Sequence, residues 1–240
     1  MLKDHAAAPI TGAMQRGLYI AASGMVSEMA RQDLIANDLA NASTPGYKAD
    51  RAIQSSFGEI LLANTATGAG VGPLGLGSRI EEQVTDFSAA PVRETGEPLD
   101  LAVVGDGYFG VRTDQGVRYT RNGQFSARAD GTLVTAQGNS VLGQDGRPVT
   151  VGADGRVDPA RVGLFNLNNP VKVGDSLLQG AAAGRGTGQV RDGALEASGA
   201  DPTRAMVDMI ASLRAYESGQ KVITTIDSTL EKAANRVGAL

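Results

Sequence analysis

Two amphipathic segments at the ends of the chain enclose a middle of different character, and this arrangement limits the folds open to it. Apolar residues recur at a helical spacing over residues 15–42 and again over residues 201–237. The chain between them is rich in glycine and in turn signals with a β pattern. We therefore predict an α+β protein, in which N- and C-terminal amphipathic helices form a coiled-coil-like layer and a central antiparallel β domain separates them in sequence.

The first predicted helix carries apolar residues at alternating spacings of four and three, which is typical of a coiled-coil seam. Pro45 disfavours helix at Thr44, and Gly46 permits a left-handed turn, so the helix should stop near Ala42. The seam positions are Leu18, Ala22, Met25, Met29, Ala36 and Leu39.

The last predicted helix begins with Asp201 as N-cap and Pro202 at the first helical position. Gly219 is its weak point, at a cost of about 1 kcal/mol relative to alanine. The apolar positions of the two predicted helices form one stripe on each helix. The sequence is consistent with packing of these stripes within one chain and with packing between chains. The stripe of the last helix is Met206, Met209, Leu213, Tyr216, Ile223, Leu230, Ala234 and Val237, with Gln220 and Asp227 as polar breaks.

The middle of the chain reads as short strands separated by turns about ten residues apart, which favours an antiparallel domain. Strands are expected over 99–104, 108–112, 117–120, 133–135, 149–151 and 162–167. Hairpin turns are expected at Asn122-Gly123, Asp130-Gly131, Asp145-Gly146 and Asp154-Gly155, since these residue types tolerate positive φ.

These patterns divide the chain into five parts. The first has no apolar periodicity, so Met14 is an alternative to Met1 as the start of the protein. The predicted parts are a disordered arm over 1–13, a helix over 14–46, an extended Gly-rich connector over 47–79, the β domain with a flexible return linker at 180–193 over 80–193, and the C-terminal helix over 194–240.

Composition excludes several classes of function. Its 22 basic and 26 acidic residues give a net charge of −4, so no basic footprint for nucleic acid is expected. The chain has no cysteine, which rules out disulfides, thiolate chemistry and cysteine metal sites. Neither a secretory signal nor an apolar run long enough to span a membrane is visible.

The motifs that usually carry chemistry are weak here. Residues 105–110 match G-x-G-x-x-G, but a strand and a turn should follow where a dinucleotide site needs a helix. His5 is the only histidine and falls in the predicted arm. Two of five carboxylates could in principle act as the acid and nucleophile of a glycosidase. The simpler interpretation is that they lie in solvated turns and strand edges. The five are Asp86, Glu94, Glu97, Asp100 and Asp106. We predict no enzyme, no catalytic or metal-binding residue, no cofactor and no small-molecule substrate.

Three motifs in order carry a family resemblance. Residues 17–25 with 36–48, which end in Thr44-Pro45-Gly46-Tyr47-Lys48, resemble the N-terminal signature of bacterial flagellar rod and hook proteins. Residues 99–109 and 119–125 resemble the central β domain of that family. Residues 195–198, 206–210 and 214–217 resemble its C-terminal helix. The signature usually has two adjacent asparagines, and Asp38 stands in place of the second.

The resemblance implies a structural subunit of the flagellar basal-body rod, the drive shaft that carries motor torque to hook and filament. It implies self-association into a helical assembly, other rod and hook proteins as partners, and export by the flagellar type III apparatus without a cleavable signal. Within the family, residues 17–25 and 195–217 favour a distal over a proximal rod protein. The alternative is a secreted β-domain binding or adhesion module with helical oligomerisation ends.

Overall fold

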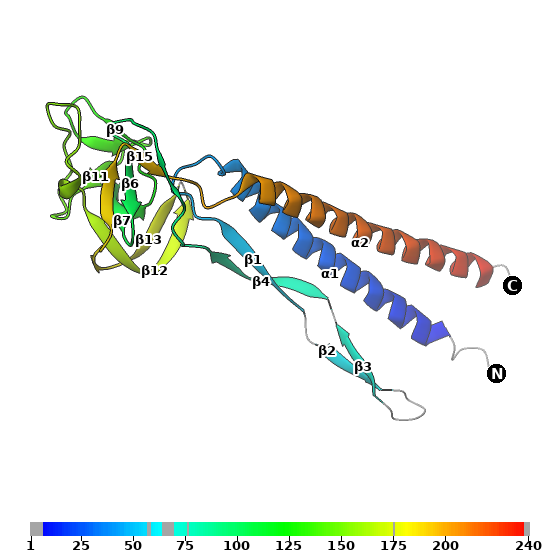
Figure 1. Cartoon of the computed structure of the whole chain (residues 1–240). Helices are drawn as coiled ribbons and strands as arrows, with labels where there is room; N and C mark the ends of the chain where they lie inside the picture. The colour runs from blue at the N-terminus through cyan, green and yellow to red at the C-terminus, as the bar shows by residue number, and fades with distance from the viewer. Residues whose placement is uncertain (1–6, 57–58, 64–69, 76, 175, 238–240) are drawn as a thin grey trace. The chain divides into compact units, whose positions relative to one another are not determined.

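The chain is divided between two compact units, each of which draws on separated parts of the sequence. The computed structural model describes residues 7–56, 59–63, 70–75, 77–174 and 176–237 (Figure 1). The first unit, called here the helical unit, comprises residues up to 37, residues 50–84 and residues from 203 onward. The second, called here the β domain, comprises residues 38–49 and 85–202. The α+β class is as predicted.

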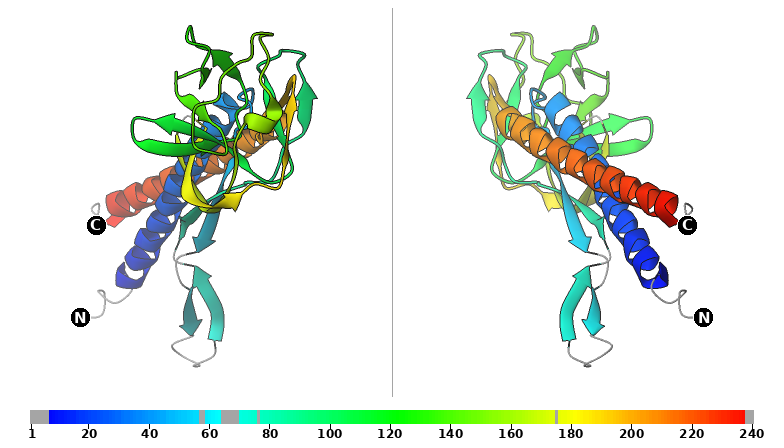
Figure 2. Two further views of the ribbon diagram at one scale, coloured as in Figure 1. Left: turned by 90° about the vertical axis from the view of Figure 1, so that its left-hand side faces the viewer. Right: turned by 90° about the vertical axis from the view of Figure 1, so that its right-hand side faces the viewer.

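The helical unit contains two long helices, α1 (Ala7–Ala40) and α2 (Pro202–Val237). Ser212 Oγ of α2 lies 2.6 Å from Glu28 Oε2 of α1. A methyl group on Gly219 would lie 2.7 Å from Met25 Cγ, and one on Gly17 would lie 3.4 Å from Ile226 Cδ1. Later residues of α2 thus meet earlier residues of α1, so the two helices run antiparallel, side by side (Figures 1 and 2).

The end of α1 and the start of α2 follow the sequence signals. α1 ends at Ala40 and Gly46 has a φ of 64°, while α2 begins at Pro202, as predicted. The start of α1 differs, because residues 7–13 are helical where a disordered arm over 1–13 was expected. Ala7 and Ala8 are strong helix formers, and Pro9 is tolerated in a first turn. Residues 1–6, with His5, lie outside the described part.

The face that α2 turns inward is only partly the predicted stripe. Its least exposed positions alternate by four and three residues and include two small residues, Ser212 and Gly219. Met206 and Leu213, which were predicted in the stripe, are 53% and 44% exposed. A search for large apolar residues at helical spacing does not find these small residues. Their small size is what allows α1 to lie close to α2. The inward positions are Ala205, Met209, Ser212, Tyr216, Gly219, Ile223, Ile226 and Leu230.

The predicted connector over 47–79 contains paired strands. β1 (Asp50–Ser56) pairs with β4 (Ser78–Thr85), and β2 (Glu59–Ala63) pairs antiparallel with β3 (Gly70–Gly75). The glycines that exclude helix therefore permit strand. This ribbon contacts α1 twice: Ser27 Oγ lies 2.9 Å from Ser78 Oγ, and Gln54 Nε2 donates to Glu28 Oε1 at 3.2 Å.

The β domain is built on one antiparallel sheet in the order β12-β13-β8-β7-β11-β10-β9. β12 also pairs with β7, so β12, β13, β8 and β7 form a closed ring of strands. Two small sheets, β14-β6 and β15-β5, complete it. The strands are β5 (Val92–Glu94), β6 (Leu101–Val104), β7 (Tyr108–Thr113), β8 (Gly116–Thr120), β9 (Phe125–Ala127), β10 (Leu133–Thr135), β11 (Ser140–Leu142), β12 (Leu164–Gly174), β13 (Leu177–Arg185), β14 (Gln189–Asp192) and β15 (Ala194–Glu196), with a short 3₁₀ helix η1 (Pro159–Arg161).

A continuous apolar core fills the β domain. Phe109 is fully buried at its centre and meets Phe125 edge to face, with ring centroids 5.3 Å apart. Its other buried members are Leu101, Val103, Val111, Leu133, Val141, Val149, Val157, Val162 and Leu164. Burial of this size stabilises a domain without help from a partner.

Most predicted strands and turns are found, with three corrections. Gly131, Gly146 and Gly155 have φ of 79°, 74° and 74°, as the Asp-Gly turns require. Residues 149–151 form no strand, since Thr150 makes only an isolated bridge with Thr132. The segment 180–193, predicted as a flexible linker, lies largely in strands. β13 belongs to the seven-stranded sheet and β14 pairs with β6.

The third correction concerns Asn122-Gly123, which makes no hairpin, because β8 pairs with β7 and β13. Gly123 has a packing role. A methyl group there would lie 1.5 Å from the carbonyl oxygen of Leu101, and the Gly123 carbonyl accepts from the Leu101 amide at 3.0 Å. The backbone of β6 occupies the space that a side chain would need.

We expect Gly123→Ala to lower the free energy of unfolding of the β domain by about 3 kcal/mol or more, since backbone must move to accept the methyl group. The matched control is Gly131→Ala, where φ is 79° and no atom lies within 4 Å. It should cost only the conformational penalty of about 1–2 kcal/mol. Urea denaturation measures both, and equal losses would contradict a steric role for Gly123.

Candidate functional site: a buried ion cluster in the β domain

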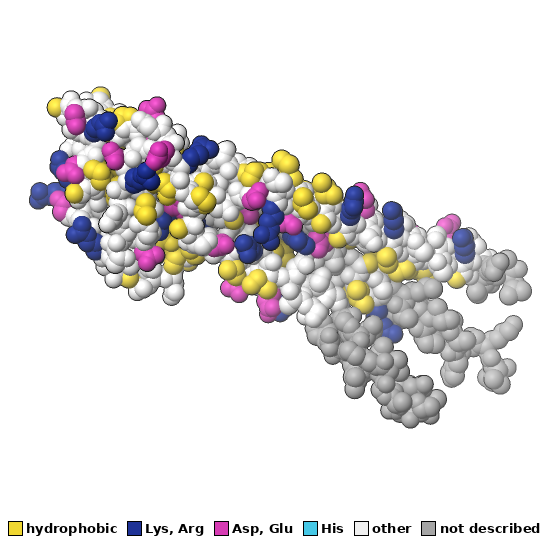
Figure 3. Space-filling model, viewed as in Figure 1, with side chains coloured by type: hydrophobic (Ala, Val, Ile, Leu, Met, Phe, Trp, Pro, Cys, Tyr) yellow, Lys and Arg dark blue, Asp and Glu magenta, His cyan; other side chains and the backbone are white. Residues whose placement is uncertain are grey.

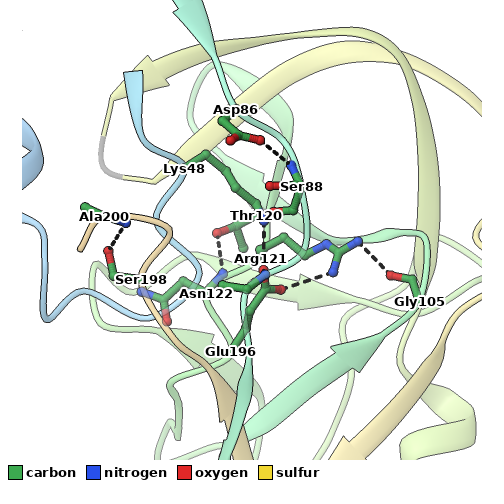
Figure 4. A network of polar contacts seen from close by, with 11 residues as sticks. Lys48, Asp86, Ser88, Gly105, Thr120, Arg121, Asn122, Glu196, Ser198 and Ala200 are labelled. Carbon is green, nitrogen blue, oxygen red and sulfur yellow. Dashed lines mark hydrogen bonds and ion pairs between the residues drawn. The ribbon is translucent and has the colours of Figure 1, made fainter. Parts of the chain in front are cut away.

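The three motifs of the sequence meet at one carboxylate. Glu196 of β15 accepts hydrogen bonds from Lys48 Nζ at 2.7 Å and from Arg121 Nη1 at 3.1 Å (Figure 4). Lys48 closes the N-terminal signature, Arg121 follows β8 in the central motif, and Glu196 lies in the C-terminal motif. Residues 148 positions apart in sequence thus form an ion pair. We call Lys48, Arg121 and Glu196 the ion cluster.

The ion cluster is buried, and almost all of its polar side-chain atoms have hydrogen-bond partners. Lys48, Arg121 and Glu196 are 3%, 4% and 1% exposed. Lys48 Nζ also donates to the carbonyl of Ser88 at 2.6 Å, and Arg121 Nη2 donates to that of Gly105 at 2.8 Å. Within the described residues Arg121 Nε is the atom of the cluster without a partner. Such pairing is what makes buried charge tolerable in a fold.

The cluster joins three separate segments of the chain at the edge of the β domain. The first is 46–49, where the Gly46 amide donates to the Glu196 carbonyl at 3.0 Å. The second is 86–91, where the Ala90 amide donates to Glu196 Oε1 at 3.0 Å and the Asp86 amide to the Ala49 carbonyl at 2.9 Å. The third is 194–200, which contains Glu196 itself.

The loop that follows α1 packs so closely that only glycine fits at its end. A methyl group on Gly46 would lie 2.2 Å from the carbonyl carbon of Arg121. On the other side, Ser198 Oγ donates to the Asn41 carbonyl at 2.9 Å and the Gly199 amide donates to the Tyr47 carbonyl at 2.8 Å. The segments before α2 and after α1 therefore hold one another within the β domain.

Arg121 also affects its neighbour Tyr108. The guanidinium carbon lies 4.9 Å from the centroid of the Tyr108 ring, at cation–π distance. Burial raises the pKa of Tyr108, and the positive charge of Arg121 opposes this shift. Tyr108 is therefore a neutral phenol at physiological pH, and its role here is to pack on the guanidinium.

The carboxylates considered from the sequence do not gather into a site. Asp100 accepts from Thr95 Oγ1 at 2.7 Å, and Asp86 accepts from the Ser88 amide at 3.0 Å. Glu94 pairs with Arg191, while Glu97 and Asp106 are exposed. No cluster of metal-binding side chains occurs among the described residues. G-x-G-x-x-G joins β6 to β7, and its first two glycines have φ of 97° and 136°.

Sequence reasoning missed the ion cluster, although each member stands within a quoted motif. Nothing in the sequence indicates that a lysine, an arginine and a glutamate from three distant motifs contact one another. A signal was present in Lys48 and Glu196, since each of these charged residues lies between two hydrophobic or small residues. In the parts of the chain that the structure describes, no helix is long and apolar enough to cross a membrane.

The β domain has its own core, the two long helices bury little between them, and the buried ion cluster joins the three motifs. Models of known protein families match the chain over three stretches. They are described as flagella basal body rod protein over 18–48, flagellar hook protein FlgE/F/G D1 domain over 102–159, and flagellar basal body rod FlgEFG protein C-terminal over 191–236.

Curated relatives match along almost the whole chain. The flagellar basal-body rod protein FlgG of Bacillus subtilis is 33% identical over 92% of this chain and 99% of its own length. The rod protein FlgF of Caulobacter vibrioides is 31% identical over 95% and 100%. The flagellar hook-basal body complex protein FlhO of Bacillus subtilis is 28% identical over 95% and 100%.

The chain belongs to the family of bacterial flagellar basal-body rod proteins. It is a structural subunit of the rod and its place is the flagellar basal body, as the motifs predicted.

We expect Glu196→Leu to lower the free energy of unfolding of the β domain by about 3–5 kcal/mol, since it leaves Lys48 and Arg121 buried without their anion. The triple variant Lys48→Met, Arg121→Met, Glu196→Leu removes all three charges and should recover most of this loss. Urea denaturation followed by tyrosine fluorescence measures both variants. If Glu196→Leu lowered the free energy of unfolding no more than the triple variant does, uncompensated buried charge would not be the cause of the loss.

Proposed function

We propose that the rod subunit polymerises through the outer faces of α1 and α2, and that neighbouring copies supply the core that the helical unit lacks. The proposal rests on one observation. Among the described side chains of the helical unit, the buried ones are Ser27, Ala205 and Ser212, all of them small. The β domain buries a phenylalanine-centred core by contrast. Helices of this length gain most of their stability from packing an apolar face, so the helical unit is completed by assembly.

The outer faces provide the apolar surface for that packing. On the first four turns of α2, four large side chains are exposed by 44–61%: Met206, Val207, Ile210 and Leu213. On α1, three are exposed by 52–66%: Tyr19, Val26 and Met29. Hydrophobic side chains lie between charged ones on the surface over α2 in Figure 3. Contiguous exposed apolar side chains of this kind mark interaction surfaces.

Contacts between unlike faces of identical subunits generate a helical filament when the rotation between subunits does not close into a ring. Such an assembly suits a drive shaft that transmits torque to the hook and filament, with other rod and hook proteins continuing the stack. The ion cluster suits the same role, because a rigid β domain passes a twist on without absorbing it. Export without a cleaved signal, through the flagellar type III apparatus, is part of this proposal.

Relatives named FlgG and FlgF match the chain at 33% and 31% identity. These similar identities do not separate the distal from the proximal rod subunit. The expectation of a distal rod subunit, which rests on the motifs, therefore stays a prediction. The relatives are rod and hook-basal-body proteins, and they give no support to the alternative of a secreted β-domain binding or adhesion module.

We expect Leu213→Asp to abolish assembly and to leave the monomer folded, because Leu213 is 44% exposed and lies outside the inward face of α2. A charge at that position would be buried against a neighbour at a cost of several kcal/mol. Motility and electron microscopy of concentrated protein report assembly, and circular dichroism reports the fold. The control is Val117→Asp, which places the same charge at a similarly exposed apolar position (42%) in β8 of the β domain, outside the helical unit. A motile Leu213→Asp strain with normal rods would refute the assignment of this face.

We further expect the amides of residues 203–237 to exchange fast in dilute protein and slowly after assembly, because their buried contacts come from neighbours. The amides of β6 and β7 should be protected in both states, since their core is complete within one chain. Hydrogen exchange at two protein concentrations measures this. Strong protection of 203–237 in a verified monomer would count against completion by assembly.

A further inference from the structure

Asp38 stands at a position where a carboxylate is not expected. It lies in the last turn of α1, which ends at Ala40, and the carbonyls at a helix C-terminus disfavour negative charge. The side chain has a specific partner in the β domain: Asp38 Oδ1 accepts a hydrogen bond from the hydroxyl of Tyr47 at 2.8 Å.

Tyr47 connects Asp38 to a cation. Tyr47 is 3% exposed, and Lys172 Nζ lies 3.9 Å from the centroid of its ring. Lys172 comes from β12, and its ammonium also donates to the carbonyl of Lys48 at 2.8 Å. One aromatic ring thus has an anion at its hydroxyl and a cation on its face, and this arrangement directly adjoins the ion cluster.

The two contacts strengthen one another. A cation on the ring face withdraws electron density, which makes the phenol a better donor to the carboxylate. The carboxylate in turn polarises the phenol so that the ring attracts the cation more strongly. The charges also offset one another, because the ion cluster carries two cations against one anion and Lys172 adds a third cation.

We propose that Asp38 and Lys172 are a matched pair, coupled through Tyr47, and that together they position the loop between α1 and β1 on the β domain. Lys172 supplies a cation that offsets the charge of Asp38 at the end of α1, and Asp38 adds an anion beside the ion cluster. The pair is therefore a positioning device of this chain, additional to the ion cluster. It concerns the folded monomer and does not depend on assembly.

The test is a double-mutant cycle with Lys172→Met and Asp38→Asn in the full chain. The readout is exchange of the Gly46 and Gly199 amides, which donate to Glu196 and Tyr47 across the loop. Lys172→Met should lower their protection about tenfold in the native background, and less than about threefold in the Asp38→Asn background. Lys172→Arg retains the cation and should preserve protection. Equal losses in both backgrounds would overturn the proposal.

A third variant tests the route of the coupling. Tyr47→Phe keeps the ring but removes the hydroxyl, so Lys172→Met should then cost the same with and without the Asp38→Asn substitution. Coupling that survives in Tyr47→Phe would overturn the role of the ring as the link. Unchanged exchange of β7 amides in each variant verifies that the core is folded, and Lys172 is partly exposed, so its replacement leaves no cavity in that core.

Discussion

The carboxylate of Glu196 holds together the edge of the β domain. It neutralises Lys48 and Arg121, and it holds the Ala90 amide in the same place. Without it, two cations would be left in an interior with little water, and the three chain segments at this edge would lose their common anchor. An apolar replacement of all three groups is often as stable as a buried ion cluster, whereas the loss of one partner leaves uncompensated charge in the interior.

This cluster explains why three motifs at great sequence separation occur together in one chain. The N-terminal motif contributes Lys48 and the left-handed Gly46, the central motif contributes Arg121, and the C-terminal motif contributes Glu196. Gly46 fits against Arg121 because it has no side chain. The motifs are thus parts of one three-dimensional contact, and a substitution in one affects the others.

Local signals predicted the fold class, the end of α1 and the start of α2, because proline, glycine and N-cap chemistry act within a few residues. The inward face of α2 was only half predicted. Ser212 and Gly219 face α1 because they are small, whereas a search for large apolar residues selects Met206 and Leu213. The ion cluster was not predicted at all, since contacts across 148 residues leave no periodic pattern.

We propose above that α2 has two distinct faces, one that packs within its own chain and one that packs on neighbouring subunits. The absence of cysteine from the chain allows a direct measurement of both faces by single thiols. Ile210→Cys places a thiol on the outer face, where the native side chain is 52% exposed, and Ser212→Cys places one on the inward face, where the native side chain is 1% exposed. In assembled rods, we expect thiol-specific cross-links between subunits from position 210 and none from position 212. Cross-links from position 212, or none from position 210, would contradict the two-faced arrangement.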